Sequence, residues 1–174
     1  MLAVANKPML QYVVEALVAV DITDIVMVVG YHREQIQDYF ASGERFRVKI
    51  QYAVQEHQLG TGHALLRAKT LMQDKFLVLP GDNIVDQLAI QRLVTTENNA
   101  VLVTKAPGNE YGSIKIEYGG VKIENGHVQG MTDNRQGDKT QWVNTSSYQL
   151  DRTILSYLAE ELDLPTAIDR MIQD

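Results

Sequence analysis

The stretch VKIQYAVQEHQLGTGHALLRAKTLMQDKFLVLPGD, residues 48–82, decides the fold. It opens with an apolar run from Val48 to Val54 and crosses a glycine-containing loop into a helical pattern from about Ala64 to Leu71. It then ends with a second apolar run, Phe76 to Leu79. A strand, a helix and a second strand in this order are typical of a βαβ unit. We therefore predict parallel strands joined by a helix here.

The same alternation continues on both sides of this stretch. Apolar residues recur at steps of three and four after Lys7-Pro8, and proline suits the first position of a helix. Further runs predict helices and strands at 9–20, 25–29, 33–40, 88–94 and 101–103. Continuous apolar strands between helices indicate a sheet that is covered on both faces. The predicted fold class is α/β, a Rossmann-like three-layer sandwich with a mostly parallel sheet.

After Pro107 the pattern changes to short strands, predicted at 113–117, 121–124 and 127–131. Asn125-Gly126 separates the last two and is a strong hairpin signal, because both turn residues need positive φ. A returning strand at 143–150 and helices at 152–160 and 165–172 follow. We predict one domain, 1–174, with a small antiparallel β insertion at about 108–142.

Composition narrows the function classes. The chain has 174 residues, a formal net charge of −6 and no cysteine, which excludes disulfides and thiolate metal sites. Without a basic block we expect no nucleic-acid partner, and with only short apolar runs no membrane partner. No signal-like segment opens the sequence, so we expect a cytoplasmic protein.

Gly81-Asp82 follows an apolar strand, at the sheet edge where ligands of open α/β folds bind. Mg²⁺ takes one or two carboxylates and completes its coordination shell with water and phosphate oxygens, so Asp82 alone is a partial magnesium site. The alternative is that Asp82 caps the turn that follows it.

The loop from Gln58 to Ala64 joins a strand to a helix. Its glycines, Gly60 and Gly62, let a planar ring or a phosphate approach the main chain, and Gln55 offers an amide donor and acceptor to a base. The alternative is an ordinary loop in which Thr61 caps the helix. We interpret His63 as a local hydrogen-bonding residue, since no acidic or histidine partner lies near it in the sequence.

Each of three further polar segments has two possible interpretations, as a ligand site or as an ordinary structural feature. Lys7 either donates to a phosphate or is solvated. Tyr111-Gly112-Ser113 and Asn144-Thr145 suit a hydroxyl-rich ligand, or are turn residues and satisfied polar groups.

Taken together, these segments resemble the nucleotidyltransferases that join nucleoside triphosphates to sugar 1-phosphates, such as glucose-1-phosphate thymidylyltransferases, the uridylyltransferases and N-acetylglucosamine-1-phosphate uridylyltransferases. Five segments carry the resemblance in order along essentially the whole chain: Val4 to Met9, Val29-Gly30-Tyr31, Gln58 to Ala64, Gly81-Asp82-Asn83, and Tyr111-Gly112 with Asn144-Thr145.

The resemblance implies roles for individual residues. Gln55, Gly60 and Thr61 would contact the base of UTP or dTTP, with Gly81 beside the nucleotide, and Asp82 would coordinate Mg²⁺. Lys7, Gly112, Asp133 and Asn144 would face the sugar 1-phosphate, Asp133 standing where relatives usually carry glutamate. No catalytic acid or base is implied. A sugar phosphate oxygen would attack the α-phosphorus and release pyrophosphate, leaving a nucleoside diphosphate sugar.

The chain also departs from the family pattern. It starts after the usual first strand, the Gly-x-Gly-Thr-Arg loop and a phosphate-neutralising lysine, and it stops before a usual second metal-binding residue. We therefore expect an exposed sheet edge, which a homo-oligomer could cover, and negligible turnover by the chain as it stands. The alternative function is a non-catalytic sugar-nucleotide-binding or partner subunit. A generic dinucleotide-binding domain is disfavoured, because no Gly-x-Gly-x-x-Gly follows a first strand.

Overall fold

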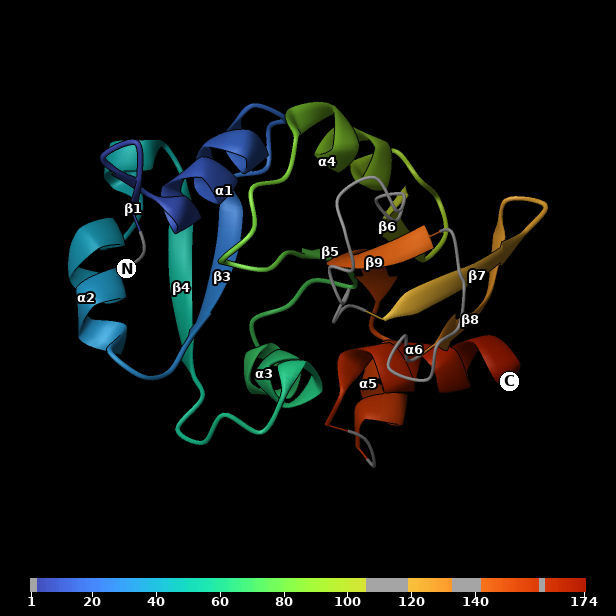
Figure 1. Cartoon of the computed structure of the whole chain (residues 1–174). Helices are drawn as coiled ribbons and strands as arrows, with labels where there is room; N and C mark the ends of the chain where they lie inside the picture. The colour runs from blue at the N-terminus through green and yellow to red at the C-terminus, as the bar shows by residue number, and fades with distance from the viewer. Residues whose placement is uncertain (1–2, 106–118, 133–141, 160–161) are drawn as a thin grey trace, which may run out of the picture.

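The computed structural model of the protein describes residues 3–105, 119–132, 142–159 and 162–174, and its helices lie on both sides of the strands (Figure 1). Its first strands are short: β1 (Ala3–Val4) pairs antiparallel with β2 (Lys7–Pro8). Helix α1 (Met9–Val18) follows at once, so Pro8 stands at its N-cap, one residue before the predicted position.

One small sheet is parallel. Strand β3 (Asp24–Val29) leads into helix α2 (Arg33–Phe40) and the 3₁₀ turn η1 (Glu44–Phe46), and the chain then returns as β4 (Lys49–Val54). Strands β3 and β4 pair in parallel register with Val29 opposite Val54. Their carboxyl ends therefore meet at one edge, as the βαβ pattern predicts.

The second sheet is built around one long strand, β9 (Trp142–Asp151). Both β5 (Lys75–Val78) and β6 (Ala100–Lys105) pair with β9 in antiparallel register. Strand β7 (Gly120–Glu124) also touches β9 and forms a hairpin with β8 (His127–Thr132).

The expectation of a mostly parallel sheet is therefore not confirmed among the described strands, where β3 and β4 alone pair in parallel and the predicted parallel strands of residues 48–82, β4 and β5, lie in different sheets. The reason lies in β9, which pairs with both β5 and β6 but runs antiparallel to them. An apolar run shows that a strand is buried but carries no information about its direction.

Two cores lie on opposite faces of β5, because successive side chains of a strand point to opposite faces. Leu77 packs with α1 and with α4 (Gln87–Val94), whose Ile90 is fully buried. Phe76 and Val78 pack instead with the helices α3 (Thr61–Ala68), α5 (Ile154–Leu158) and α6 (Leu164–Gln173). Figure 1 shows α1 and α4 above the strands and α3, α5 and α6 below them.

Most predicted elements are confirmed within a few residues. The Asn125-Gly126 hairpin is present, with φ of 51° and 80° at its two turn residues. Helix α3 begins at Thr61, three residues before the predicted start, and α5 is shorter than the predicted helix. The predicted strand at 113–117 lies outside the described residues. No helix within the described part of the chain is long and apolar enough to cross a membrane.

Candidate functional site

Gln55 is the best-defined polar residue of the site. It follows β4, and its backbone N–H donates to the carbonyl of Val29 at 2.8 Å, extending the parallel pairing by one residue. The residue is only 9% exposed. The amide nitrogen Nε2 lies 3.1 Å from the carbonyl oxygen of Gly60 and 2.9 Å from Nδ1 of His63. The side chain is thus held against the glycine loop that was predicted to bind the base.

The glycines of this loop lie where a side chain would collide with neighbouring residues of the same chain. Gly60 has φ of 116°, and a Cβ atom there would lie 2.7 Å from the carbonyl oxygen of Leu162. A Cβ atom on Gly62 would lie 2.7 Å from the same oxygen and 2.6 Å from the Leu158 side chain. Close approach of the chain near the start of α6 therefore explains both glycines without a ligand.

Thr61 is not the cap of α3, so that alternative is wrong: Gly60 holds the N-cap position and no side chain caps this helix. The Thr61 hydroxyl oxygen instead accepts a hydrogen bond from the backbone N–H of Leu164 at 3.3 Å. The backbone N–H of His63 donates to the carbonyl of Leu162 at 3.2 Å. The interpretation of His63 as a local hydrogen-bonding residue is confirmed.

Asp82 lies in the exposed turn after β5. The next helix, α4, is capped by Asp86, whose side chain accepts hydrogen bonds from the backbone N–H groups of Leu88 and Ala89 at 2.9 and 3.4 Å. No group of three or more acidic or histidine side chains suited to a metal occurs within the described ranges. Asp82 is thus a single carboxylate at the end of a strand.

Gly81 places this turn beside helix α1. A Cβ atom on Gly81 would lie 3.4 Å from the side chain of Leu10, in ordinary contact distance. Leu10 follows closely after Lys7, so the Gly81-Asp82 turn and the start of α1 belong to the same corner of the molecule.

Lys7 is neither simply solvated nor free. Its Nζ lies 2.5 Å from a carboxylate oxygen of Glu15 and 3.8 Å from the centre of the Tyr12 ring. Hydrogen bonds from Lys7 and Gln11 lower the pKa of the Glu15 carboxyl. The ion pair partly neutralises the positive charge that a phosphate would need.

Asn144 lies on β9 and is 5% exposed. Its Nδ2 donates to the hydroxyl oxygen of Tyr148 at 2.6 Å, and its Oδ1 accepts from the backbone N–H of Ser146 at 2.8 Å. Burial raises the pKa of Tyr148 to about 12. Ser146 has φ of 58°, an unusual value for a residue with a side chain. The predicted sites Gly112 and Asp133 lie outside the described residues.

Residues 162–164 link the glycine loop to the region of Asn144 and Tyr148. Leu162 and Leu164 hold the glycine loop through the hydrogen bonds described above, while the charge of Asp163 contributes to the raised pKa of Tyr148. Neither this segment nor Tyr148 was predicted from the sequence. For the segment the reason is distance along the chain, because more than a hundred positions separate Thr61 from Leu164. No local pattern signals such a contact.

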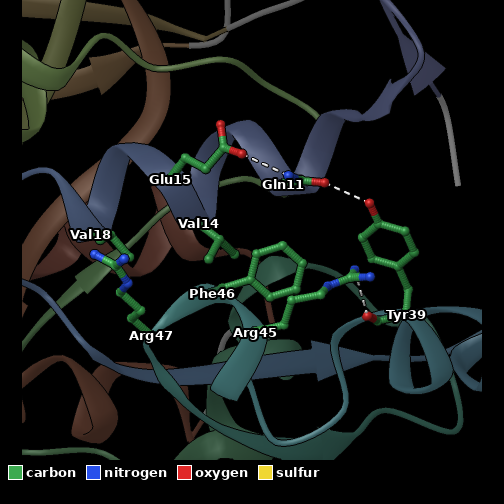
Figure 2. A pocket seen from close by; sticks show the side chains of 8 residues that line it. All are labelled: Gln11, Val14, Glu15, Val18, Tyr39, Arg45, Phe46 and Arg47. Atoms are coloured by element: carbon green, nitrogen blue, oxygen red, sulfur yellow. Dashed lines mark hydrogen bonds between the residues drawn. The ribbon is translucent and has the colours of Figure 1, made fainter.

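A hollow of about 510 Å³ lies elsewhere, between α1, α2 and η1 (Figure 2). Its polar groups mostly satisfy one another: Gln11 bonds to Glu15 and to the Tyr39 hydroxyl, and Arg45 bonds to the Tyr39 carbonyl. The Arg45 guanidinium also stacks on the Tyr39 and Phe46 rings. None of the predicted site residues lines it, and its satisfied groups indicate packing between elements more than a ligand site.

Comparison with known proteins points in one direction. The model of a family described as nucleotidyl transferase matches residues 1–174. A bifunctional protein GlmU of Methanococcus maripaludis is 32% identical over 99% of this chain and 41% of its own length, and that of Methanococcus vannielii is 31% identical over 99% and 42%. The chain spans about two fifths of the length of these curated relatives.

Solved structures agree on the fold. A UDP-glucose pyrophosphorylase crystallised with UDP-glucose superposes with a TM-score of 0.83 at 19% identity, covering 99% of this chain and 78% of that one. A Bacillus anthracis protein assigned as a glucose-1-phosphate thymidylyltransferase gives a TM-score of 0.74 at 26% identity, covering 97% and 68%.

Proposed function

Because this chain belongs to the nucleotidyl transferase family, we propose that it binds UTP or dTTP together with a sugar 1-phosphate, as a domain for making nucleoside diphosphate sugars. In that reaction an oxygen of the sugar phosphate attacks the α-phosphorus, the bond to the β-phosphate breaks, and pyrophosphate leaves. Positioning and charge neutralisation account for most of the catalysis in phosphoryl-transfer chemistry.

The observation that carries the proposal is the buried Gln55 amide tied to the glycine loop. Burying a polar side chain destabilises a protein unless its polar atoms form hydrogen bonds. This side chain is buried at the carboxyl edge of the parallel strands, where ligands of open α/β sheets bind. Gly60 and Thr61 lie in the same loop, and the base would lie against these three residues.

Mg²⁺ is part of the proposal. Asp82 fits the ion, because its carboxylate is exposed at the end of a strand and the capping of α4 is left to Asp86. Asp82 would hold the ion, with Gly81 leaving space beside it, and the ion when bound supplies positive charge against the phosphates.

The sugar 1-phosphate is assigned to Asn144, Lys7, Gly112 and Asp133. Asn144 supports this role because its amide is fixed at both ends by Tyr148 and Ser146 and so presents a defined geometry. For Gly112 and Asp133 the assignment rests on the sequence alone.

The test is nucleotide binding by calorimetry with and without Mg²⁺. We expect binding of UTP or dTTP that Mg²⁺ strengthens, and loss of that strengthening in Asp82→Ala, while the control Asp38→Ala on the exposed side of α2 keeps it. Unchanged Mg²⁺ dependence in Asp82→Ala would remove the metal role, and no binding of either nucleotide would remove the proposed function.

A second candidate, binding of a sugar nucleotide without transfer, is favoured by the Lys7–Glu15 ion pair, which partly neutralises the Lys7 charge that a triphosphate would need. We accordingly expect this chain to release pyrophosphate from UTP or dTTP and glucose 1-phosphate very slowly. Rapid release by the purified chain would decide against the second candidate.

A further inference from the structure

We propose that His63 is a positioning residue: it fixes the Gln55 amide so that the carbonyl oxygen Oε1, and not the amide nitrogen, faces the nucleobase and accepts a hydrogen bond from it. The inference rests on the proposed function, since it assumes that a base lies against the glycine loop. It identifies His63, which was not predicted as a site residue, and it specifies that Oε1 is the atom of Gln55 that bonds to the base.

The orientation of the amide follows from its neighbours. The group 3.1 Å from the Gln55 amide end is the carbonyl oxygen of Gly60, which can only accept a hydrogen bond. The donor Nε2 must therefore lie on that side, because an oxygen there would face another oxygen. Gly60 alone, however, uses only one of the two hydrogens of Nε2.

His63 takes the second hydrogen. Its Nδ1 lies 2.9 Å from the same Nε2, and since Nε2 carries only donors, Nδ1 must be the acceptor. A neutral imidazole that accepts at Nδ1 carries its proton on Nε2. With both hydrogens of Gln55 used inside the protein, the amide cannot rotate without losing two hydrogen bonds.

What remains for a ligand is Oε1. Gln55 is more than nine-tenths buried, and no hydrogen bond to Oε1 is found between residues of the described ranges. A buried acceptor without a partner is costly, so a ligand that brings an N–H to it gains affinity. The imide N3–H of uracil or thymine is such a donor, whereas N3 of cytosine carries a lone pair and would meet another acceptor.

The start of α3 supplies the complementary group. The backbone N–H groups of Thr61 and Gly62 belong to the first turn of the helix and find no backbone acceptor in the described part of the chain. A donor from the main chain and an acceptor from Gln55 in one loop match an imide edge, which places a carbonyl oxygen beside an N–H.

The experiment compares UTP with CTP and with N3-methyl-UTP, using the whole chain and its variants. We expect the unmodified chain to prefer UTP to both competitors by at least about tenfold. His63→Leu removes the acceptor for Gln55 and should lose most of that preference, while His63→Asn, whose Oδ1 can accept near the position of Nδ1, should restore it. The matched control His57→Leu, an exposed histidine in the same loop, should keep it.

Equal preference in His63→Leu and in the unmodified chain would overturn the inference. A measurement without ligand guards against a variant that fails to fold: long-range ¹H–¹⁵N spectra of the unmodified chain should show His63 protonated on Nε2 only. Protonation on Nδ1 would overturn the inference by itself. Failure of the unmodified chain to bind any of the nucleotides would instead count against the proposed function, and the spectra would still decide the state of His63.

Discussion

Gly60 shows how one residue can serve the fold and the candidate site at once. Its φ of 116° and ψ of 173° belong to a region of backbone space that is essentially limited to glycine. The missing side chain also leaves room for the Leu162 carbonyl, which would lie 2.7 Å from a Cβ atom. The loop is therefore shaped by its contact with the start of α6 before any ligand arrives.

We predict that Gly60→Ala lowers the free energy of unfolding by about 1–3 kcal/mol, because it adds backbone strain and a clash with main chain. Urea denaturation followed by circular dichroism would measure the change. Gly126→Ala is the control, since a Cβ atom there meets nothing within 4 Å although φ is 80°. Equal losses in the two variants would show that the contact with Leu162 is unimportant.

Tyr148 gives a prediction at high pH. Burial raises its pKa to about 12 in the folded protein, from an ordinary value of 10.0. Between these values the unfolded chain loses the proton while the folded chain keeps it, so the folded state is the more protonated one. The contribution of Tyr148 to stability is therefore fully present below pH 10 and is lost as the pH rises toward 12.

We expect this decline to cost about 1–3 kcal/mol in the unmodified chain. Tyr148→Phe should show a shallower decline, although it starts from a lower stability because Asn144 loses its partner. Denaturation curves at several pH values would compare the two slopes. Parallel slopes would mean that Tyr148 does not titrate as its burial requires.

Asp86 caps a helix, whereas Asp82, for which the sequence left both capping and metal binding open, does not. Asp86 caps α4 through the N–H groups of Leu88 and Ala89, whereas Asp82 has no capping bond in the described part of the chain. We predict that Asp86→Ala lowers the free energy of unfolding by about 1 kcal/mol and that Asp82→Ala leaves it unchanged. Thermal denaturation without nucleotide would measure both changes. A loss of stability in Asp82→Ala alone would mean that Asp82, and not Asp86, is the capping residue.

Local patterns predicted the elements well where the signal was local. Helix 33–40 and the Asn125-Gly126 hairpin follow from periodicity and turn chemistry, and both are confirmed. The direction of β9 and the contact of Leu162 with the glycine loop depend on residues far apart in the sequence, so no local pattern contains them. Gln55 was found as a candidate, but the bonds that orient its amide were not. Gly60 and His63 are near it in the sequence, yet their positions depend on how the loop packs against Leu162.

Side chains, and not backbone pairing, join the two sheets. In the described part of the chain no backbone pairing connects β3 with β5, and the residues that bridge them come from the core under α1 and α4. Ile90, which is 0% exposed, lies in this core, and Leu88, on the same helix, is 63% exposed.

We predict that Ile90→Ala lowers the free energy of unfolding by about 2–5 kcal/mol, because it leaves a cavity in the core that both sheets share. Leu88→Ala should change it by less than about 0.5 kcal/mol. Chemical denaturation with separate probes for the two sheets would show whether they still unfold together. A small loss in Ile90→Ala would mean that this core contributes little to stability.

The interruption between β3 and β5 also matters for how the protein behaves in concentrated solution. Each of these strands has a partner on one side only among the described strands, so a row of amide and carbonyl groups on its other side can accept an added strand. The tendency to self-associate therefore depends on how often these rows are uncovered, and a variant of higher melting temperature need not be easier to concentrate or store.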